Sequence, residues 1–296
     1  MNRRIFFSLL LSSALLAAFT LTAGARQAPS APVERLAMKY FEQLPPDNNV
    51  IEAGALFPVM KEGGDMLILD VRSPDDYRKG HLKGAVNLSY FDLSIPEALE
   101  KLPTDRPIMV YCYTGQAASQ VAVLLNIAGK TAKSIQSGFN HAIIKTEGHE
   151  TMLEQAVHEL PETAGAVAPE VKSAVEDFFK YKMSLEGTPF AQYGVWPKTV
   201  SAIMSENSGD YLFVSVRQAD AYAKGHLPGA LNVPFGRGMG KDLVKLPRDK
   251  KIIVYCYTGQ TSAQVMTVLR MMGYDAFFML GGMDAWTVDE GQAKAD

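Results

Sequence analysis

The chain has 296 residues, of which 47% are hydrophobic and 21% are charged, which is the composition of a folded globular protein and not of a disordered or collagen-like one. A net charge of −3 and a pI near 6.0 argue against binding of nucleic acid or anionic membranes by bulk charge. The two cysteines and five histidines lack the spacings of a structural zinc site. The length predicts two domains of ordinary size.

The first 25 residues have the pattern of a secretory signal peptide. Arg3 and Arg4 precede 17 uncharged residues, Ile5 to Leu21 (21 − 5 + 1 = 17), and small residues at Ala23 and Ala25 follow at the positions that a signal peptidase reads. We expect cleavage after Ala25 and export of the chain to a bacterial periplasm. An uncleaved anchor is the alternative, because a run of about 17–25 apolar residues spans a bilayer.

The rest of the chain contains the same unit twice. Residues 67–86 read LILDVRSPDDYRKGHLKGAV and residues 212–231 read LFVSVRQADAYAKGHLPGAL, at an offset of 145 (217 − 72). Residues 108–116 read IMVYCYTGQ and residues 252–260 read IIVYCYTGQ, at an offset of 144 (256 − 112). The duplication predicts two copies of one domain. The expected boundaries are 31–158 for domain 1, 159–170 for a linker rich in Pro, Ala and Gly, and 171–296 for domain 2.

Within each unit, predicted strands and helices alternate. Short apolar runs predict buried parallel strands, and the second run of each unit leads into an amphipathic helix that should stop at Gly129 or Gly273. Such alternation predicts an α/β fold with two three-layer domains, each a mainly parallel sheet flanked by helices. The expected segments are leading helices at 33–44 and 171–183, and strands at 66–71, 108–111, 211–216, 252–255 and 276–280.

Each cysteine ends a predicted strand and begins a loop that leads into a helix. Cys112 and Cys256 should therefore lie at the carboxyl edge of a parallel sheet, where ligands of α/β proteins bind. Gly115 and Gly259 allow the loop to curl so that backbone N–H groups point inward, and such a nest at a helix N-terminus stabilises an anion. The expected anion is the thiolate, a strong nucleophile whose pKa a helix N-terminus can lower below about 8.5.

Two other interpretations of the cysteines stay open, namely inert buried residues and one disulfide between them. Cysteine recurs at the same position of the repeated motif and nowhere else, which favours a reactive thiol in each domain. A Cys112–Cys256 bridge would have to join equivalent sites of two separate domains, each of which should open at the edge of its own sheet.

Both units resemble the rhodanese family of sulfurtransferases in the pattern D-V-R…Y…K-G-H-L-x-G-A…V-Y-C-Y-T-G-Q…G-G-M-D-A-W, over roughly residues 50–142 and 195–287. The resemblance implies that Cys112 and Cys256 take sulfane sulfur from a small donor, hold it as a persulfide and pass it to a thiol or cyanide acceptor, without a cofactor or metal. The loop residues implied to cradle the persulfide are Tyr113, Thr114, Gly115, Gln116, Ala117 and Ala118 in domain 1, and Tyr257, Thr258, Gly259, Gln260, Thr261 and Ser262 in domain 2.

Other matching residues lie off the cysteine loops and are expected to be structural. The pairs Gly80-His81 and Gly225-His226 should shape a turn. The arginine of each D/S-V-R segment should pair with a carboxylate or cap a carbonyl. Domain 2 has Ser215 where domain 1 has Asp70. The structural set is Asp70, Arg72, His81, Arg217 and His226.

The chain departs from the family in its charges. Neither loop contains Lys, Arg or His, whereas rhodaneses that use thiosulfate usually place cations there, so thiosulfate is expected to be a poor donor. Phosphatases on this fold need an arginine six residues after the cysteine, where this chain has Ala118 and Ser262. Arg237 has Asp92 as its counterpart at the 145 offset. If the Gly-rich loop that carries Arg237 borders the pocket, the Cys256 site is cationic and the Cys112 site is not. On that basis we hypothesise that Cys256 handles an anionic donor better.

The favoured function is an exported sulfurtransferase whose donor is thiosulfate, polysulfide or a persulfide, with a periplasmic protein as a further candidate acceptor. The alternative is a non-catalytic carrier of sulfane sulfur or a partner-binding rhodanese module. A thiol-redox protein is disfavoured, because the sequence places no second cysteine near either site.

Overall fold

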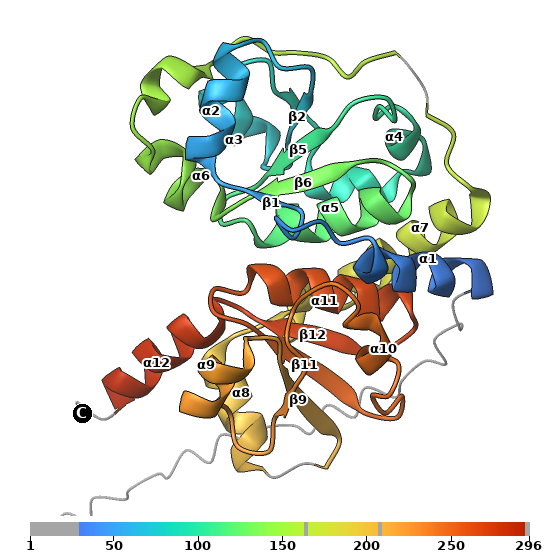
Figure 1. The fold of residues 1–296 in the computed structure, drawn as a ribbon, viewed down its shortest axis with the longest axis vertical. Helices are drawn as coiled ribbons and strands as arrows, with labels where there is room; N and C mark the ends of the chain where they lie inside the picture. The colour runs from blue at the N-terminus through green and yellow to red at the C-terminus, as the bar shows by residue number, and fades with distance from the viewer. Residues whose placement is uncertain (1–29, 163–164, 207–208, 294–296) are drawn as a thin grey trace, which may run out of the picture.

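The protein is described by a computed structural model over residues 30–293 apart from 163–164 and 207–208, so the expected signal peptide lies outside the described residues. Figure 1 shows two α/β domains that follow one another along the chain. Within the described residues, each domain has a parallel sheet of five strands, in the order β1-β6-β5-β2-β4 and β10-β9-β11-β12-β8. The predicted fold class is confirmed, because helices flank both sheets.

The strands of the two sheets lie close to the predicted segments. They are β1 (Val50–Ile51), β2 (Leu67–Asp70), β4 (Val86–Asn87), β5 (Ile108–Tyr111) and β6 (Ala132–Ile135), then β8 (Gly194–Val195), β9 (Tyr211–Ser215), β10 (Leu231–Asn232), β11 (Lys251–Tyr255) and β12 (Ala276–Met279). A small antiparallel pair, β3 (His81–Leu82) with β7 (Leu153–Glu154), adds to domain 1. Asp70 pairs with Tyr111 and Ser215 pairs with Tyr255, so the repeat preserves the sheet register.

Helices cover both faces of each sheet, which is why the central strands β2 and β5 of domain 1 are buried along their whole length. In the part of the chain that the structure describes, no helix is long and apolar enough to span a bilayer. The α-helices are α1 (Ala31–Glu42), α2 (Ala53–Lys61), α3 (Pro74–Lys79), α4 (Pro96–Glu100), α5 (Gln116–Ile127), α6 (Gly138–His141), α7 (Pro169–Ser184), α8 (Pro197–Ser205), α9 (Ala219–Lys224), α10 (Gly240–Leu243), α11 (Gln260–Met271) and α12 (Gly282–Ala293). Short 3₁₀ turns include η1 (Tyr90–Ser94) and η4 (Ala191–Tyr193).

Glycine ends the two helices that follow the cysteine loops, as predicted. Gly129 has φ +82° and Gly273 has φ +87°, left-handed values that glycine adopts without strain. The helix α7 begins with proline in its first turn. A proline is tolerated there because the N–H that it lacks would have no partner within the helix.

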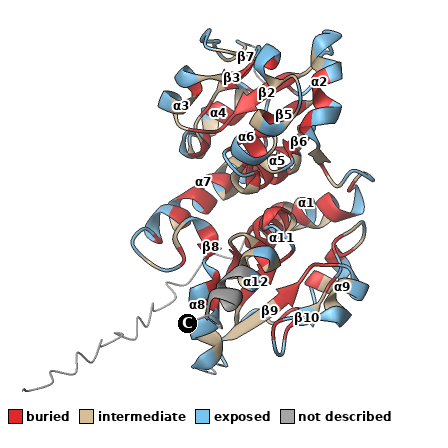
Figure 2. Ribbon diagram, turned by 90° about the vertical axis from the view of Figure 1, so that its left-hand side faces the viewer, coloured by how far each residue is buried: buried red, intermediate tan, exposed pale blue. Residues whose placement is uncertain are grey.

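The two domains share one buried interface built on α5 and α11, which pack against each other (Figure 1). Residues 262–271 of α11 are all buried, because one side of this helix faces its own sheet and the other faces domain 1. Figure 2 shows the same helices as buried between the sheets. A single apolar cluster therefore runs through both domains.

The leading helix of each domain packs on the other domain. The helix α7, which begins domain 2, contacts α4 and η1 of domain 1, and α1 contacts α10 and α11 of domain 2. This exchange matters for the cysteine sites, because the loops next to them are covered by residues from both halves of the chain.

Candidate functional site

The sulfur of each cysteine lies inside the curl of its loop. Cys112 follows β5, and its Sγ accepts the N–H groups of Gly115 at 3.1 Å and Ala118 at 3.3 Å. In domain 2, Cys256 Sγ accepts the N–H of Gly259 at 3.1 Å. Each glycine precedes its helix with φ near +90° (+87° and +90°), so the expected loop curl with inward N–H groups is present.

A second turn in each domain forms a hydrogen bond to the backbone of the cysteine. Ser137-Gly138 and Gly281-Gly282, which follow β6 and β12, all have positive φ between 55° and 67°. The next residue then donates its N–H to the cysteine carbonyl, from Phe139 at 2.8 Å in domain 1 and from Met283 at 2.9 Å in domain 2. A Cβ at Gly138 would lie 2.5 Å from the carbonyl oxygen of Cys112, so glycine is required there.

Both thiols are free, and both cysteines are buried at 3% and 2% exposure, so the structure contains no Cys112–Cys256 bridge. Burial raises the pKa of the Cys112 thiol, and the loop N–H groups, led by that of Ala118, oppose this effect. Desolvation of the thiolate outweighs its amide donors. The expectation of a lowered pKa is therefore wrong for Cys112.

A cavity of about 390 Å³ opens beside Cys112 at the contact between the domains. Domain 2 closes it with Lys182, Gln192, Phe278 and Leu280. The predicted loop residues that line it are Tyr113, Thr114, Gln116 and Ala117. Gly115 and Ala118 instead contact the sulfur through their backbone, so the structure brings all six predicted loop residues of domain 1 to the sulfur or to this cavity.

The two loop glutamines reach into the opposite domain. Gln116 Nε2 donates to the carbonyl of Thr258 at 3.0 Å. Gln260 Oε1 accepts the N–H of Ser137 at 3.0 Å, and its Nε2 donates to Ser134 Oγ at 3.1 Å. Gln260 is 6% exposed and so joins the loop of Cys256 to the turn behind Cys112. The resemblance implied that Gln260 cradles sulfur at Cys256. In the structure its side-chain amide instead forms hydrogen bonds to domain 1.

The remaining domain 2 loop residues have local roles or lie at the surface. Ser262 Oγ donates to the carbonyl of Gly259 at 3.1 Å, which tightens the first turn of α11. Tyr257 is exposed at 44% and lies with its ring centroid 5.9 Å from the guanidinium of Arg217. Thr261 is half-buried.

In domain 1 the structural arginine pairs with a buried carboxylate. Arg72 donates its backbone N–H to Asp70 Oδ1 at 2.9 Å and its Nη2 to Asp70 Oδ2 at 2.7 Å. It also donates to the carbonyl of Gly80 at 2.7 Å and lies 3.7 Å from the ring centroid of Phe139. The ion pair is 0–3% exposed, so Asp70 offsets most of the positive charge that Arg72 would bring to the Cys112 cavity.

In domain 2 the same arginine has no carboxylate. Arg217 donates to the carbonyl of Gly225, the second of its two expected roles. Its Nε and the Oγ of Ser215 are both buried and have no hydrogen-bond partner among the described residues. Loss of the carboxylate at position 215 thus leaves a guanidinium, 6% exposed, without an ion pair in the described part of the chain.

The motif histidines shape turns, as expected. His81 is fully buried and stacks on Tyr77 at 3.7 Å, and its ring nitrogens lie 2.7 Å from the carbonyl of Tyr77 and 2.9 Å from that of Ala156. His226 stacks on Tyr222 at 3.8 Å but is exposed. The two histidines differ because β7 and the chain after it cover only the turn of domain 1.

One described cluster has metal-ligand residue types. His81, Glu154 and His158 place one ligand atom each within 4.8 Å of one another. Glu154 Oε1 already accepts His158 at 2.8 Å and the N–H of Gly84, while His81 faces two carbonyls. These contacts account for the cluster as a clamp that holds residues 153–158 on domain 1.

Arg237 makes a contact between the domains, and its predicted role at the Cys256 site stays a prediction. Its Nε donates to the carbonyl of Leu44 at 2.9 Å, so it ties domain 2 to the end of the leading helix of domain 1. Its counterpart Asp92 caps η1 through Ser89. The premise that the Cys112 site has no cation is wrong, because Lys182 lines its cavity.

Sequence reasoning missed Lys182 because this residue belongs to the other domain. A signal was present, since Val171, Val175 and Phe178 form the buried stripe of α7 and Lys182 continues it at the next four-residue step. A lysine on an apolar stripe is a candidate for a buried functional charge.

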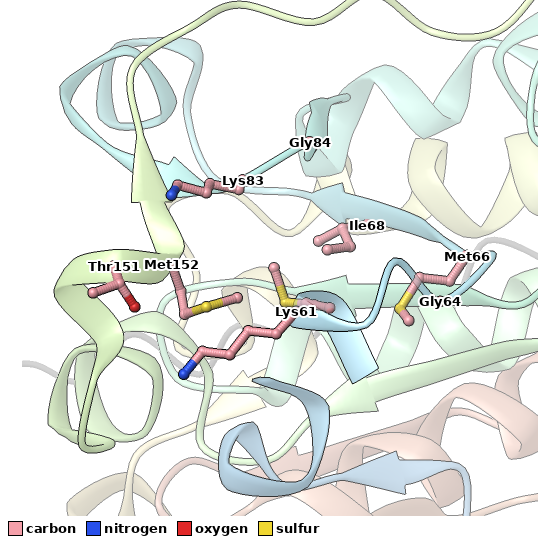
Figure 3. Close-up of a pocket in the computed structure, with 9 residues that line it drawn as sticks. Lys61, Gly64, Met66, Ile68, Lys83, Gly84, Thr151 and Met152 are labelled. Carbon is pink, nitrogen blue, oxygen red and sulfur yellow. The ribbon is translucent and has the colours of Figure 1, made fainter. Parts of the chain in front are cut away.

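A second cavity, of about 440 Å³, lies near the amino end of β2, away from both cysteines. Figure 3 shows Met66, Met152, Thr151 and the lysines Lys61 and Lys83 around it. Its lining contains methionines and lysines but neither cysteine, so the cavity beside Cys112 is the better candidate site.

Comparison with known proteins gives one family and several similar chains. The Rhodanese-like domain family matches residues 57–143 and 197–289. A thiosulfate sulfurtransferase, GlpE of Coxiella burnetii, is 38% identical over 76 residues, which is 25% of this chain and 69% of that protein. A tRNA sulfurtransferase of Desulfurococcus amylolyticus is 29% identical over 116 residues, or 36% of this chain, and this chain spans only 23% of that protein. The crystal structure of Escherichia coli SseA, a 3-mercaptopyruvate sulfotransferase, is 21% identical and covers 79% of this chain and 98% of its own, with a TM-score of 0.37.

Proposed function

The chain belongs to the rhodanese-like domain family, with two of its domains, and on that premise we propose that it is a sulfurtransferase in which Cys112 and Cys256 carry sulfane sulfur as persulfides. The observation that carries the proposal is the Cys112 sulfur, which accepts two backbone N–H groups and faces a cavity of about 390 Å³. Both cysteine loops have this curl, so the same chemistry is proposed for each domain.

The cysteine thiol first loses its proton to solvent, and in the first half-reaction the resulting thiolate attacks the outer sulfur of the donor. A bond forms between Sγ and that sulfur, and the bond from the outer sulfur to the rest of the donor breaks, with its electron pair leaving on the product. With thiosulfate the balance is Cys–S⁻ + S–SO₃²⁻ → Cys–S–S⁻ + SO₃²⁻. The N–H groups of Gly115 and Ala118 hold the charge on Sγ before the attack.

In the second half-reaction a thiolate or cyanide attacks the outer sulfur of the persulfide. The S–S bond breaks, its electron pair returns to Sγ, and the product is a persulfide or thiocyanate. The added sulfur extends the side chain by about 2.05 Å, the length of an S–S bond. The cavity beside Cys112 has room for this atom and for a small donor or acceptor.

Export is part of the proposal and rests on the sequence of residues 1–25. The donor is a small sulfane-sulfur compound, thiosulfate, polysulfide or a persulfide, and a periplasmic protein thiol is the candidate macromolecular acceptor.

Burial of the two sulfurs, at 3% and 2% exposure, also favours a second function, a carrier that protects a persulfide without turning over. Both functions predict loading of the thiols, but only the enzyme predicts repeated transfer.

The test uses the mature chain and the variants Cys112→Ser, Cys256→Ser and both together. Each protein is exposed to thiosulfate or inorganic polysulfide, and its intact mass is measured by mass spectrometry. Cyanide is then added, and the formation of thiocyanate is followed over time. We expect one added sulfur per remaining cysteine and multiple turnovers. Loading followed by a single transfer would favour the carrier, and the absence of loading by every donor would overturn both functions.

A further inference from the structure

Domain 2 places a buried ammonium group in the cavity of the other domain's cysteine. Lys182, on α7, is 4% exposed and lines the cavity beside Cys112. Its Nζ donates to the carbonyl of Gln192 at 3.0 Å and lies 4.3 Å from the ring centroid of Tyr90, which also lines the cavity. The helix α7 packs directly on η1, the turn that carries Tyr90.

Lys182 has a charge that its surroundings do not offset. Among the described residues, no carboxylate forms an ion pair with its Nζ, whereas the other cation of the cavity, Arg72, is paired with Asp70. Burial and, second, the positive charge of Arg270 lower the pKa of Lys182 to about 7. Near neutral pH the amine is therefore only partly protonated, and an anion that enters the cavity stabilises its charged, ammonium form.

The fold itself does not require a lysine at this position. Phe179 of α7 meets Tyr90 edge to face at 5.1 Å, and Phe41 of α1 meets Phe235 in the same way at 5.9 Å. These pairs align the leading helices at an offset of 138 (179 − 41), which places Leu44, just past the end of α1, at the sequence position of Lys182 (182 − 138). Leu44 is 1% exposed, so an apolar residue packs well there in the other half of the molecule.

We propose that Lys182 is the anion-binding residue of the Cys112 site, which makes this site a composite of both domains and gives it a preference for anionic sulfur donors over neutral ones. The inference rests on the proposed sulfur transfer and names the donor class of one site. The ammonium binds the anionic end of the donor while its outer sulfur meets Cys112. It then stabilises the charge of the departing group, sulfite in the case of thiosulfate. The Cys256 site has Leu44 at the corresponding position and lacks this residue.

The test is made in the Cys256→Ser background, where Cys112 is the only thiol. Lys182→Leu copies the residue at the equivalent position of the other half, and Lys182→Gln is the second variant. We expect the KM for thiosulfate to rise about 10–100-fold, because each variant loses one charge-assisted hydrogen bond to the donor. Lys180→Leu is the matched control, because Lys180 is exposed on the same helix and pairs with Glu176.

A second measurement does not depend on sulfur transfer. Iodoacetate and iodoacetamide alkylate the same thiol but differ in charge, so the ratio of their rates at Cys112 reports the field in the cavity. We expect Lys182→Leu and Lys182→Gln to lower this ratio about tenfold or more, and Lys180→Leu to leave it as in the parent protein. An unchanged ratio in both Lys182 variants overturns the role of Lys182, whether or not the protein turns over. A lowered ratio without turnover keeps the anion site and refutes only the sulfurtransferase.

Discussion

At position 70 and its counterpart 215, one change of residue gives two equivalent arginines opposite environments. Asp70 forms a buried ion pair with Arg72, while Ser215 leaves Arg217 without a carboxylate in the described residues. A buried charge that has lost its partner costs more free energy than a buried pair. Domain 2 is therefore less stable at this position than domain 1.

Ser215→Asp is expected to raise the free energy of unfolding by about 1–3 kcal/mol, because the new carboxylate can accept the free Nε of Arg217. Urea denaturation measures the change. Ser215→Asn is the control, since it has the same shape without the charge. The reverse change, Asp70→Ser, should cost about 3–5 kcal/mol. The explanation fails if the Asp and Asn variants at position 215 are equally stable.

The Cys112 thiol should titrate later than an ordinary one. Because burial raises its pKa, alkylation in the Cys256→Ser variant should still accelerate as the pH rises above about 8.5, the ordinary thiol value. The unfolded chain ionises first, so this residue's contribution to stability is complete below about pH 8.5 and declines above it. Iodoacetamide rates from pH 6 to 10, beside those of the urea-unfolded protein, test this. A half-maximal rate at lower pH in the folded protein would contradict it.

At the scale of elements, the site depends on the turn between strand and helix more than on any one side chain. The curl before α5 needs the left-handed backbone of Gly115, and the turn before α6 places Ser137 in the same region, where domain 2 has Gly281. In each domain one turn contacts the sulfur of the cysteine and the other contacts its backbone carbonyl. They leave no space for an added Cβ at Gly138.

Gly115→Ala should disturb the site, because a Cβ there would lie 2.8 Å from Gln260 Oε1 and 3.0 Å from the backbone nitrogen of Ser137, on a backbone of φ +87°. We expect a loss of about 2–4 kcal/mol in unfolding free energy and slower sulfur loading of Cys112. Gly129→Ala is the matched control, with φ +82° and open space, and should cost only about 1 kcal/mol. Equal effects of the two substitutions on stability and loading would show that backbone strain alone, and not the crowded loop, matters.

At the scale of the molecule, the two domains form one structural unit. The helices α5 and α11 bury each other, and each leading helix packs on the opposite domain. The Cys112 cavity is closed by residues of domain 2, so removal of domain 2 would open it to water. The duplication therefore gives the Cys112 site residues that its own domain does not contain.

Gln260→Ala should weaken the Cys112 site although Gln260 lies in the loop of Cys256. Its amide bonds Ser134 and Ser137 across the interface while 6% exposed, so its loss leaves buried polar groups without partners. We expect a stability loss of about 1–3 kcal/mol and slower loading at Cys112. Gln116→Ala, which removes the bond to Thr258 at a more exposed position, is the comparison for stability and should cost less. Unchanged loading of Cys112 in Gln260→Ala would show that the domains do not support each other's sites.

The local features of this protein follow from its sequence. Hydrophobic runs, the 144–145-residue repeat and the glycines of the VYCYTGQ loops determined the strands, the fold class and the position of each cysteine at the end of a strand. The strands and the loop turns depend on residues within a few positions of one another, because backbone sterics and periodic burial act over that range. The repeat can be seen in the sequence because it needs only a comparison of the chain with itself.

Only the tertiary structure decided what surrounds the two sulfurs. Gln260 meets Ser134 across 126 positions of sequence, and Lys182 reaches the Cys112 cavity from a helix that the repeat assigns to the other domain. The direction of the Cys112 pKa shift was also decided there, because it depends on how completely the packed domains exclude water. Burial and charge at a point in space are sums over every nearby group, and a linear pattern does not show which distant groups those are.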